Sequence, residues 1–218
     1  MTFPRLLDVR TGHAAPVNGH LTAYGKASRA GPVAAHALGL EGDEVANTRV
    51  HGGPEKAVYA YSNAAYARWR ASHPGHAARL VPGAFGENLL FEGLDEEKVC
   101  VGDRWRVGSA LLEPCQPRQP CSTMARWFGD PGMVKAMVGN GLSGWYCRVV
   151  EPGVLEAGVE ARLEHRPEGA WTIARVLEAS YRPEGPAELL ALAEAPGLAS
   201  SWAAWAARSA KAPAPKAV

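Results

Sequence analysis

Long apolar runs, blocks of basic residues and a secretion signal are all missing from this sequence. No apolar stretch reaches the roughly 20 residues that a membrane-spanning helix needs. The start, Met-Thr-Phe-Pro-Arg5, lacks the apolar segment of a secretory leader. With 23 Lys and Arg against 22 Asp and Glu, the formal net charge is +1, and no basic cluster stands out. These absences argue against a membrane protein, a secreted protein and a protein that binds nucleic-acid polymers.

Cysteine is also scarce, and its spacing argues against two common uses. The four cysteines, Cys100, Cys115, Cys121 and Cys147, form neither Cys-x-x-Cys pairs nor the dense set of a disulfide scaffold. A zinc site is therefore not indicated, and free thiols suit a reducing compartment, so we expect a cytoplasmic protein. Motifs for flavin, haem or iron–sulfur clusters are absent too, which leaves the chain without a visible store of electrons.

The first three quarters of the chain consist of short apolar runs separated by Gly and Pro. This pattern is typical of many short strands joined by turns, and it favours a β-barrel or a sandwich. The expected strands are residues 6–9, 32–40, 57–61, 99–101, 105–107, 110–113, 145–150 and 159–163. Helices are expected at about 63–71, behind a Ser62 cap, at 122–128 and at 133–138. Helices inserted into a barrel often frame the mouth of a pocket.

The composition changes after residues 165–169, and Ala- and Leu-rich segments follow near 173–180, 187–195 and 201–210. We therefore predict a β-barrel domain over 1–166, a domain of three α-helices over 167–210 and a frayed tail over 211–218. The fold class is mainly β, within α+β. About forty-five residues hardly support a core of their own, so the helical unit should pack on the barrel or on a second subunit, which favours a homodimer.

Cys121 is the cysteine whose surroundings indicate chemistry. It ends the string Gln116-Pro-Arg-Gln-Pro-Cys121, where a rigid, proline-bounded loop is expected to enter a helix near Ser122. The free N–H groups of the first helical turn and the cations Arg118 and Arg126 would stabilise the thiolate over the thiol. A thiolate is a nucleophile and a ligand for soft metals. The alternative is a structural cysteine that fills the core.

A glycine pair between a histidine and a lysine marks a second candidate. In His51-Gly-Gly-Pro-Glu-Lys56, Gly52 and Gly53 allow backbone conformations in which successive N–H groups point at one anion. Lys56 would add the matching positive charge. The string is therefore similar to a phosphate cradle, and the alternative is a tight turn between two strands in which His51 is a structural residue.

Two further strings carry polar residues that suit either a ligand or a turn. Glu87 and Asn88 follow a glycine-rich approach and precede an apolar pair, so Asn88 either caps the turn or presents its amide to a ligand. Lys26, Ser28 and Arg29 place two cations and a hydroxyl in an expected loop, which either binds an anion or is a solvated surface turn.

Six strings of this chain, taken in order, resemble the MOSC domain family in its YiiM-like bacterial branch. They are Gly39-Leu-Glu-Gly-Asp43, His51-Gly-Gly-Pro-Glu-Lys-Ala-Val58, Phe85-Gly-Glu-Asn-Leu89, Val101-Gly-Asp103, Gln116-Pro-Arg-Gln-Pro-Cys121 and Gly144-Trp-Tyr146. The resemblance covers nearly the whole chain, because Pro196-Gly-Leu-Ala-Ser-Ser-Trp202 is similar to the three-helix domain of this branch. It implies a MOSC-type β-barrel with inserted helices and a small C-terminal three-helix domain.

The resemblance also implies a cofactor and residues that bind it. MOSC oxidoreductases hold the molybdenum cofactor, Mo-molybdopterin, through a cysteine thiolate, and Cys121 matches that position. The other residues expected on the cofactor side are Lys26, Ser28, Arg29, His51, Gly52, Gly53, Lys56, Glu87, Asn88 and Arg118. The chain departs from the family pattern over residues 26–33, where it is shorter by several residues and lacks a further lysine.

For activity, the resemblance implies reduction of N-hydroxylated compounds, such as hydroxylaminopurines, to the amines. Since no electron store is visible in the chain, the electrons would come from an external flavoprotein reductase. Two other functions stay open, namely a non-enzymatic carrier or sulfur-delivery module for the cofactor, and a metal-free Cys/His hydrolase or transferase. Molybdenum content and turnover of an N-hydroxylated base distinguish the three.

Overall fold

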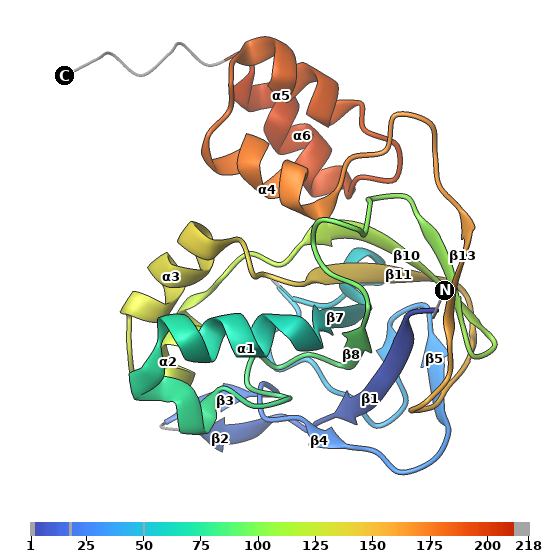
Figure 1. Cartoon of the computed structure of the whole chain (residues 1–218), viewed down its shortest axis with the longest axis vertical. Helices are drawn as coiled ribbons and strands as arrows, with labels where there is room; N and C mark the ends of the chain where they lie inside the picture. The colour runs from blue at the N-terminus through green and yellow to red at the C-terminus, as the bar shows by residue number, and fades with distance from the viewer. Residues whose placement is uncertain (1–2, 18, 50, 212–218) are drawn as a thin grey trace.

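An eight-stranded sheet organises the fold (Figure 1). The computed structural model describes residues 3–17, 19–49 and 51–211. The strands follow the order β13-β9-β10-β11-β7-β8-β1-β4, and only β7 and β8 pair in parallel. Their bounds are β1 (Arg5–Thr11), β4 (Ala27–Ser28), β7 (Val58–Ser62), β8 (Leu89–Glu92), β9 (Arg104–Val107), β10 (Ala110–Pro117), β11 (Trp145–Glu151) and β13 (Ala161–His165).

The predicted barrel does not close, although the α+β class is confirmed. At the start of β1, the Leu6 N–H donates to the Val159 carbonyl at 2.9 Å, and the Ala161 N–H donates to the Pro4 carbonyl at 2.8 Å. The other end of the same edge pairs with β4 instead, through Arg10 and Thr11. Since β4 occupies half of this edge, the residues leading into β13 meet β1 at one end only, and the sheet stays open elsewhere.

The remaining strands form two smaller sheets, and they differ from the strands that the sequence predicted. One pairs β12 (Gly153–Leu155), β5 (Val33–His36) and β6 (Gly39–Leu40), and the other pairs β2 (Ala15–Val17) with β3 (His20–Thr22). The strand expected over 32–40 is therefore a hairpin, because the chain turns at residues 37–38. Residues 99–101 contribute only an isolated bridge between Cys100 and Thr172, so the strand predicted there was wrong.

The helices between the strands gather on one side of the sheet (Figure 1). They are α1 (Asn63–Ser72), α2 (Ser122–Phe128) and α3 (Gly132–Asn140), and the short helix η2 (Pro74–Arg79) follows α1. A second short helix, η1 (Pro54–Lys56), precedes β7 and contacts β11 instead. Together with the turn before β8, the apolar faces of α1, α2 and α3 bury a cluster that includes Tyr66 and Trp69 of α1, Phe85, Met124 of α2 and Met137 of α3. This packing secures α2 and the loops around its first turn. Ser62 precedes α1 as predicted but makes no side-chain cap bond.

The C-terminal helices α4 (Ile173–Tyr181), α5 (Pro186–Ala193) and α6 (Ser200–Ser209) form one end of the molecule (Figure 1). Their apolar residues, such as Val176 and Trp202, belong to the same buried cluster as the sheet residues. The hydroxyl of Thr172 caps α4, accepting from the Arg175 N–H at 3.1 Å. The unit therefore packs on its own sheet, whereas the homodimer and the domain limits stay predictions. Residues 212–218 of the expected tail lie outside the described part of the chain.

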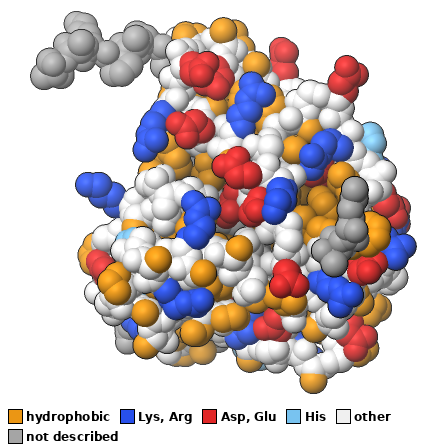
Figure 2. Space-filling model, in the orientation of Figure 1, with side chains coloured by type: hydrophobic (Ala, Val, Ile, Leu, Met, Phe, Trp, Pro, Cys, Tyr) orange, Lys and Arg blue, Asp and Glu red, His pale blue; other side chains and the backbone are white. Residues whose placement is uncertain are grey.

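The surface carries mixed charge on the face that Figure 2 shows, where acidic and basic side chains lie side by side. Within the described residues, every helix falls short of the length and apolar character that crossing a bilayer demands.

Candidate functional site

A cavity of about 400 Å³ lies at the start of α2, between the loop that leads to η1 and the chain between β3 and β4. It brings together residues from well-separated stretches of the chain. The predicted site residues that line it are Lys26, His51, Gly52, Lys56, Asn88, Arg118 and Cys121. Four others, Ser28, Arg29, Gly53 and Glu87, are not among the lining residues.

Cys121 is the partly exposed cysteine of this cavity, and it immediately precedes α2, which begins at Ser122 as predicted. Partial burial acts to raise the pKa of the thiol. A hydrogen bond with the His51 side chain, the charge of Arg118, and hydrogen bonds from the Met124 backbone and the Thr123 side chain outweigh burial and lower the pKa to about 6. Cys121 is therefore a thiolate at neutral pH.

Arg118 is a buried cation without a carboxylate partner among the described residues. Its guanidinium carbon lies 5.6 Å from the ring centre of Tyr24 and 5.4 Å from that of Tyr59. Its N–H groups face the sulfur atoms of Met124 and Met137 at 3.5 and 3.4 Å. Another N–H group donates to the Tyr24 hydroxyl at 3.5 Å. Rings, thioethers and a neutral hydroxyl do not neutralise the charge, so burying it is costly unless an anion enters the cavity. The negative charge of the Cys121 thiolate offsets part of this cost.

Three tyrosines that the sequence analysis did not select line the cavity around Arg118. Tyr59 of β7 and Tyr146 of β11 are register partners, with ring centres 5.2 Å apart, and Tyr24 lies in the loop after β3. Burial raises the pKa of each phenol, and the nearby Arg118 opposes that shift only in part. The tyrosines therefore stay neutral and form a wall of rings and uncharged hydroxyls around Arg118. The Tyr59–Tyr146 pair could have been found only once the strand register was known.

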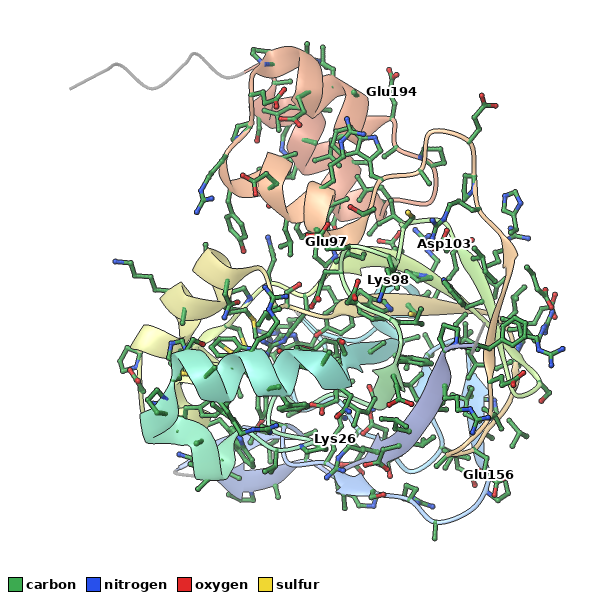
Figure 3. The ribbon with its side chains drawn as sticks, in the orientation of Figure 1. Lys26, Glu97, Lys98, Asp103, Glu156 and Glu194 are labelled. Atoms are coloured by element: carbon green, nitrogen blue, oxygen red, sulfur yellow. The ribbon has the colours of Figure 1, made fainter. Side chains whose placement is uncertain are left out.

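Lys26 and Asn88 belong to a polar network centred on Asp43, another residue that the sequence analysis missed. The Lys26 ammonium donates to the Asp43 carboxylate. Lys26 lies at the opposite end of the molecule from the C-terminal helices (Figure 3). The Asn88 amide donates to Asp43 at 2.9 Å and to the Arg10 carbonyl at 3.1 Å, and its oxygen accepts from the Tyr59 N–H at 3.0 Å. These bonds favour the structural alternative for Asn88. Burial lowers the pKa of Lys26, and Asp43 opposes the shift.

The glycine pair turns the chain into η1 and leaves Lys56 on the cavity. Gly52 and Gly53 have φ values of +76° and +83°, which favour glycine. Gly53 precedes η1, and its carbonyl accepts from the Lys56 N–H at 3.0 Å. The pair therefore forms the predicted turn, but only Gly52 lines the cavity.

Ser28 and Arg29 do not reach the cavity because β4 pairs with the edge of β1. The Ser28 hydroxyl donates to Asp8 at 2.5 Å, and Arg29 donates to the Thr11 hydroxyl at 3.0 Å. Both residues are exposed at this edge. Their predicted place in the cofactor site is therefore not supported by the geometry.

Glu87 is buried behind the cavity rather than in its wall. Its carboxylate accepts from the Tyr66 hydroxyl, from the Gly83 N–H at 2.6 Å and from the Phe85 N–H at 3.3 Å. Burial raises the pKa of Glu87, and these hydrogen bonds counteract the shift. The side chain anchors the turn over residues 83–86, so a direct cofactor contact is not supported.

A metal in this cavity would find one soft protein ligand. Within the part of the chain that the structure describes, no three His, Cys, Asp or Glu side chains gather closely enough to hold a metal ion. Cys121 would therefore be joined by ligand atoms that belong to a cofactor. The residues fit a sulfur-rich metal group with an anionic tail, because a thiolate lies beside the unpaired cation Arg118, and Lys56 lines the same cavity.

Comparisons with known proteins show that the chain belongs to the MOSC domain family. The family model of the MOSC domain matches residues 47–162. Protein YiiM of Escherichia coli is 35% identical over 203 residues, which cover 93% of this chain and 90% of that protein. The crystal structure of YiiM from Geobacillus stearothermophilus superposes with a TM-score of 0.81 at 31% identity, covering 96% of this chain and all of that one. A protein of Gibberella moniliformis named "Reductase" is 37% identical over 78% of this chain, which spans 31% of that protein.

Proposed function

Since the chain belongs to the MOSC domain family, we propose that it is a cytoplasmic, molybdenum-cofactor-dependent enzyme that reduces N-hydroxylated compounds to the amines. The observation that carries the proposal is the cavity in which the Cys121 thiolate lies beside Arg118, a buried cation that lacks a carboxylate partner in the described part of the chain. A relative named a reductase supports an oxidoreductase role. Hydroxylaminopurines represent the substrate class.

When bound, the molybdenum cofactor supplies two-electron reduction of the N–O bond. The substrate takes up two electrons and two protons, and it leaves as the amine and one water. An external flavoprotein reductase would deliver the electrons, because the chain shows no motif for a second redox centre.

The chain's own residues hold and orient the reacting groups. Cys121 would be the protein ligand to the metal, and its low pKa keeps the sulfur deprotonated for that role. Arg118 and Lys56 would neutralise the anionic part of the cofactor. The tyrosine wall around Arg118 limits water at this end of the cavity, which strengthens each charge interaction there.

His51 is the residue placed to handle a proton next to the sulfur. Its side chain shares a hydrogen bond with Cys121 and lines the same cavity. An imidazole in this position would hold the Cys121 sulfur in orientation and supply a proton to the leaving hydroxyl of the substrate. The structural role considered for His51 in a turn is compatible with this arrangement.

The test combines metal analysis with turnover. Protein made in a host that produces the cofactor should contain molybdenum and reduce 6-hydroxylaminopurine with a reduced viologen dye. Cys121→Ala should lose turnover by at least about 10³-fold, because the metal loses its protein ligand. Cys100→Ala is the matched control, since it removes a buried thiol outside the cavity wall.

The other functions give different results in the same experiment. A carrier or sulfur-delivery module would retain molybdenum but leave the N-hydroxylated base unchanged. A Cys/His hydrolase would be active in protein from a host unable to make the cofactor. Turnover that survives Cys121→Ala would contradict the proposed reductase.

A further inference from the structure

Glu55 and Lys56 are neighbours on η1, yet their side chains contact different parts of the molecule. Lys56 lines the cavity, whereas the Glu55 carboxylate is bound to the C-terminal helical unit. A shift of Glu55 is therefore expected to move Lys56 as well, because the two residues are adjacent in one three-residue helix. This connection gives the helical unit a mechanical link to the cavity.

The Glu55 carboxylate is held by the first turn of α6 and by one arginine. It accepts from the Ser200 N–H at 2.9 and 3.1 Å, from the Ser200 hydroxyl at 2.9 Å and from Arg148 at 2.7 Å. A carboxylate at this end of a helix is also stabilised by the helix dipole. Partial burial acts to raise the pKa of Glu55, but the bonds from Ser200 and Arg148 outweigh it, so the pKa is lowered. Glu55 is thus a firmly ionised anchor.

A second line of hydrogen bonds joins α6 to the segment that ends in Cys121. The Trp202 indole N–H donates to the Gln116 side-chain oxygen at 2.9 Å, and the Gln116 amide donates to the Glu55 carbonyl at 2.8 Å. Gln116 is buried near the end of β10, just before the loop over residues 118–121. Through Ser200 and Trp202, α6 therefore contacts both the turn that carries Lys56 and the root of the loop that carries Cys121.

We propose that Glu55 is a positioning residue and that α6 sets the distance between the Lys56 and Cys121 walls of the cavity. The helical unit then acts as part of the site's support through Glu55 and Gln116, rather than as an appendage. The inference rests on the proposed function only in treating this cavity as the working site. It concerns the bare protein, so it does not depend on which reaction the loaded enzyme catalyses.

The experiment measures how strongly the cavity favours an anion at Cys121. Full-length protein from a host without the cofactor is labelled with iodoacetate, which is negatively charged, and with iodoacetamide, which is neutral. The ratio of the two rate constants cancels the fraction of thiolate, because both reagents attack the same form. It therefore reports the local positive potential. Cys121 is the partly exposed thiol, and the other cysteines are buried.

Lys56→Ala should lower the iodoacetate-to-iodoacetamide ratio by about fivefold, since one nearby positive charge is lost. Glu55→Gln and Trp202→Phe should lower it by at least about twofold, because Lys56 loses its anchored position. The sign of the Glu55→Gln effect is decisive. Removing a negative charge without moving Lys56 would raise the ratio instead.

Glu194→Gln is the matched control, because Glu194 is exposed on the same helical unit and lies far from the cavity (Figure 3). It should leave the ratio unchanged. Thermal melting shows whether each variant is folded, and Ser200→Ala, which removes only one hydroxyl bond, replaces any variant that is not. An unchanged or raised ratio in folded Glu55→Gln and Trp202→Phe would overturn the inference, as would an unchanged ratio in Lys56→Ala. Loss of the proposed reductase activity alone would not affect it.

Discussion

Cys115 and Cys121 belong to one continuous segment, yet the fold gives their sulfur atoms opposite properties. Cys115 is buried in β10, and burial raises the pKa of its thiol to about 12. Cys121 lies at the start of α2, where His51 and Arg118 help lower the pKa of its thiol to about 6. The neighbouring arginines differ in the same way. Arg148, on the Cys115 side, is paired with Glu55 and Glu113, whereas Arg118 has no carboxylate partner among the described residues.

The two sides differ in where their charged groups find partners. Near Cys115 the partners are other protein groups, whereas near Cys121 the positive charge is available to a ligand. On the Cys115 side, hydrogen bonds and ion pairs between protein groups satisfy the polar atoms. On the Cys121 side, a thiolate and a buried guanidinium share a cavity wall, and among the described residues the guanidinium is in contact with neutral groups rather than a carboxylate. Burying the Arg118 charge in this way lowers the stability of the folded protein, and binding of an anionic group in the cavity would restore that stability.

The largest difference is expected in thiol labelling of the native protein. At pH 7, iodoacetamide should label Cys121 at least about 10³-fold faster than Cys115, because only the thiolate reacts. The Cys121 rate should fall as the pH drops through about 6, since the lowered pKa keeps the thiolate present above that value. Peptide mapping by mass spectrometry measures both rates. Unfolded protein is the control, in which the two cysteines should react at similar rates. Equal rates in the native protein would contradict the predicted difference between the two thiols.

The second prediction compares how replacement of Arg118 and of Arg148 changes molybdenum content and the free energy of unfolding, where a smaller difference is expected. Arg118→Met should lower molybdenum content about tenfold while leaving the free energy of unfolding unchanged or about 1 kcal/mol higher, because it removes an unpaired buried charge. Arg148→Met should lower the free energy of unfolding by about 2 kcal/mol, since it leaves Glu55 and Glu113 without their partner. Urea unfolding of the cofactor-free protein and metal analysis measure the two effects. A large loss of stability in Arg118→Met would mean that its guanidinium is structural.

The smallest effect is expected at the edge of the sheet. Ser28→Ala should leave molybdenum content within about twofold of the unchanged protein, because its hydroxyl is bonded to Asp8 outside the cavity. Metal analysis beside Arg118→Met gives the comparison. If Ser28→Ala lost molybdenum as strongly as Arg118→Met, β4 would have to contact the cofactor, and the cavity lining would have to extend beyond Lys26.

Sequence reasoning located most of the site because local patterns encode it. The loop before Ser122 and the helix after it follow from prolines and helix periodicity, and the turn at Gly52 and Gly53 follows from glycine's access to positive φ. Sequence reasoning could not decide between the two roles left open for Asn88, and it did not place Glu87 behind the cavity wall. Both are polar residues near glycines, and the bonds that make them structural come from partners far away in the chain, such as Asp43 and Tyr66.

The three C-terminal helices, the start of α2 beside Cys121 and the family were determined by the sequence itself, since each depends on residues close together or on motifs in a set order. So were the strands near residues 6–9, 57–61, 105–107, 110–113, 145–150 and 159–163. Only the tertiary structure decided that the sheet stays open, that Tyr24, Tyr59 and Tyr146 surround Arg118, and that α6 supports Glu55. These features depend on strand register and on contacts between distant segments. Burial and charge then set which of two nearby thiols is ionised, and neither quantity exists until the chain has folded.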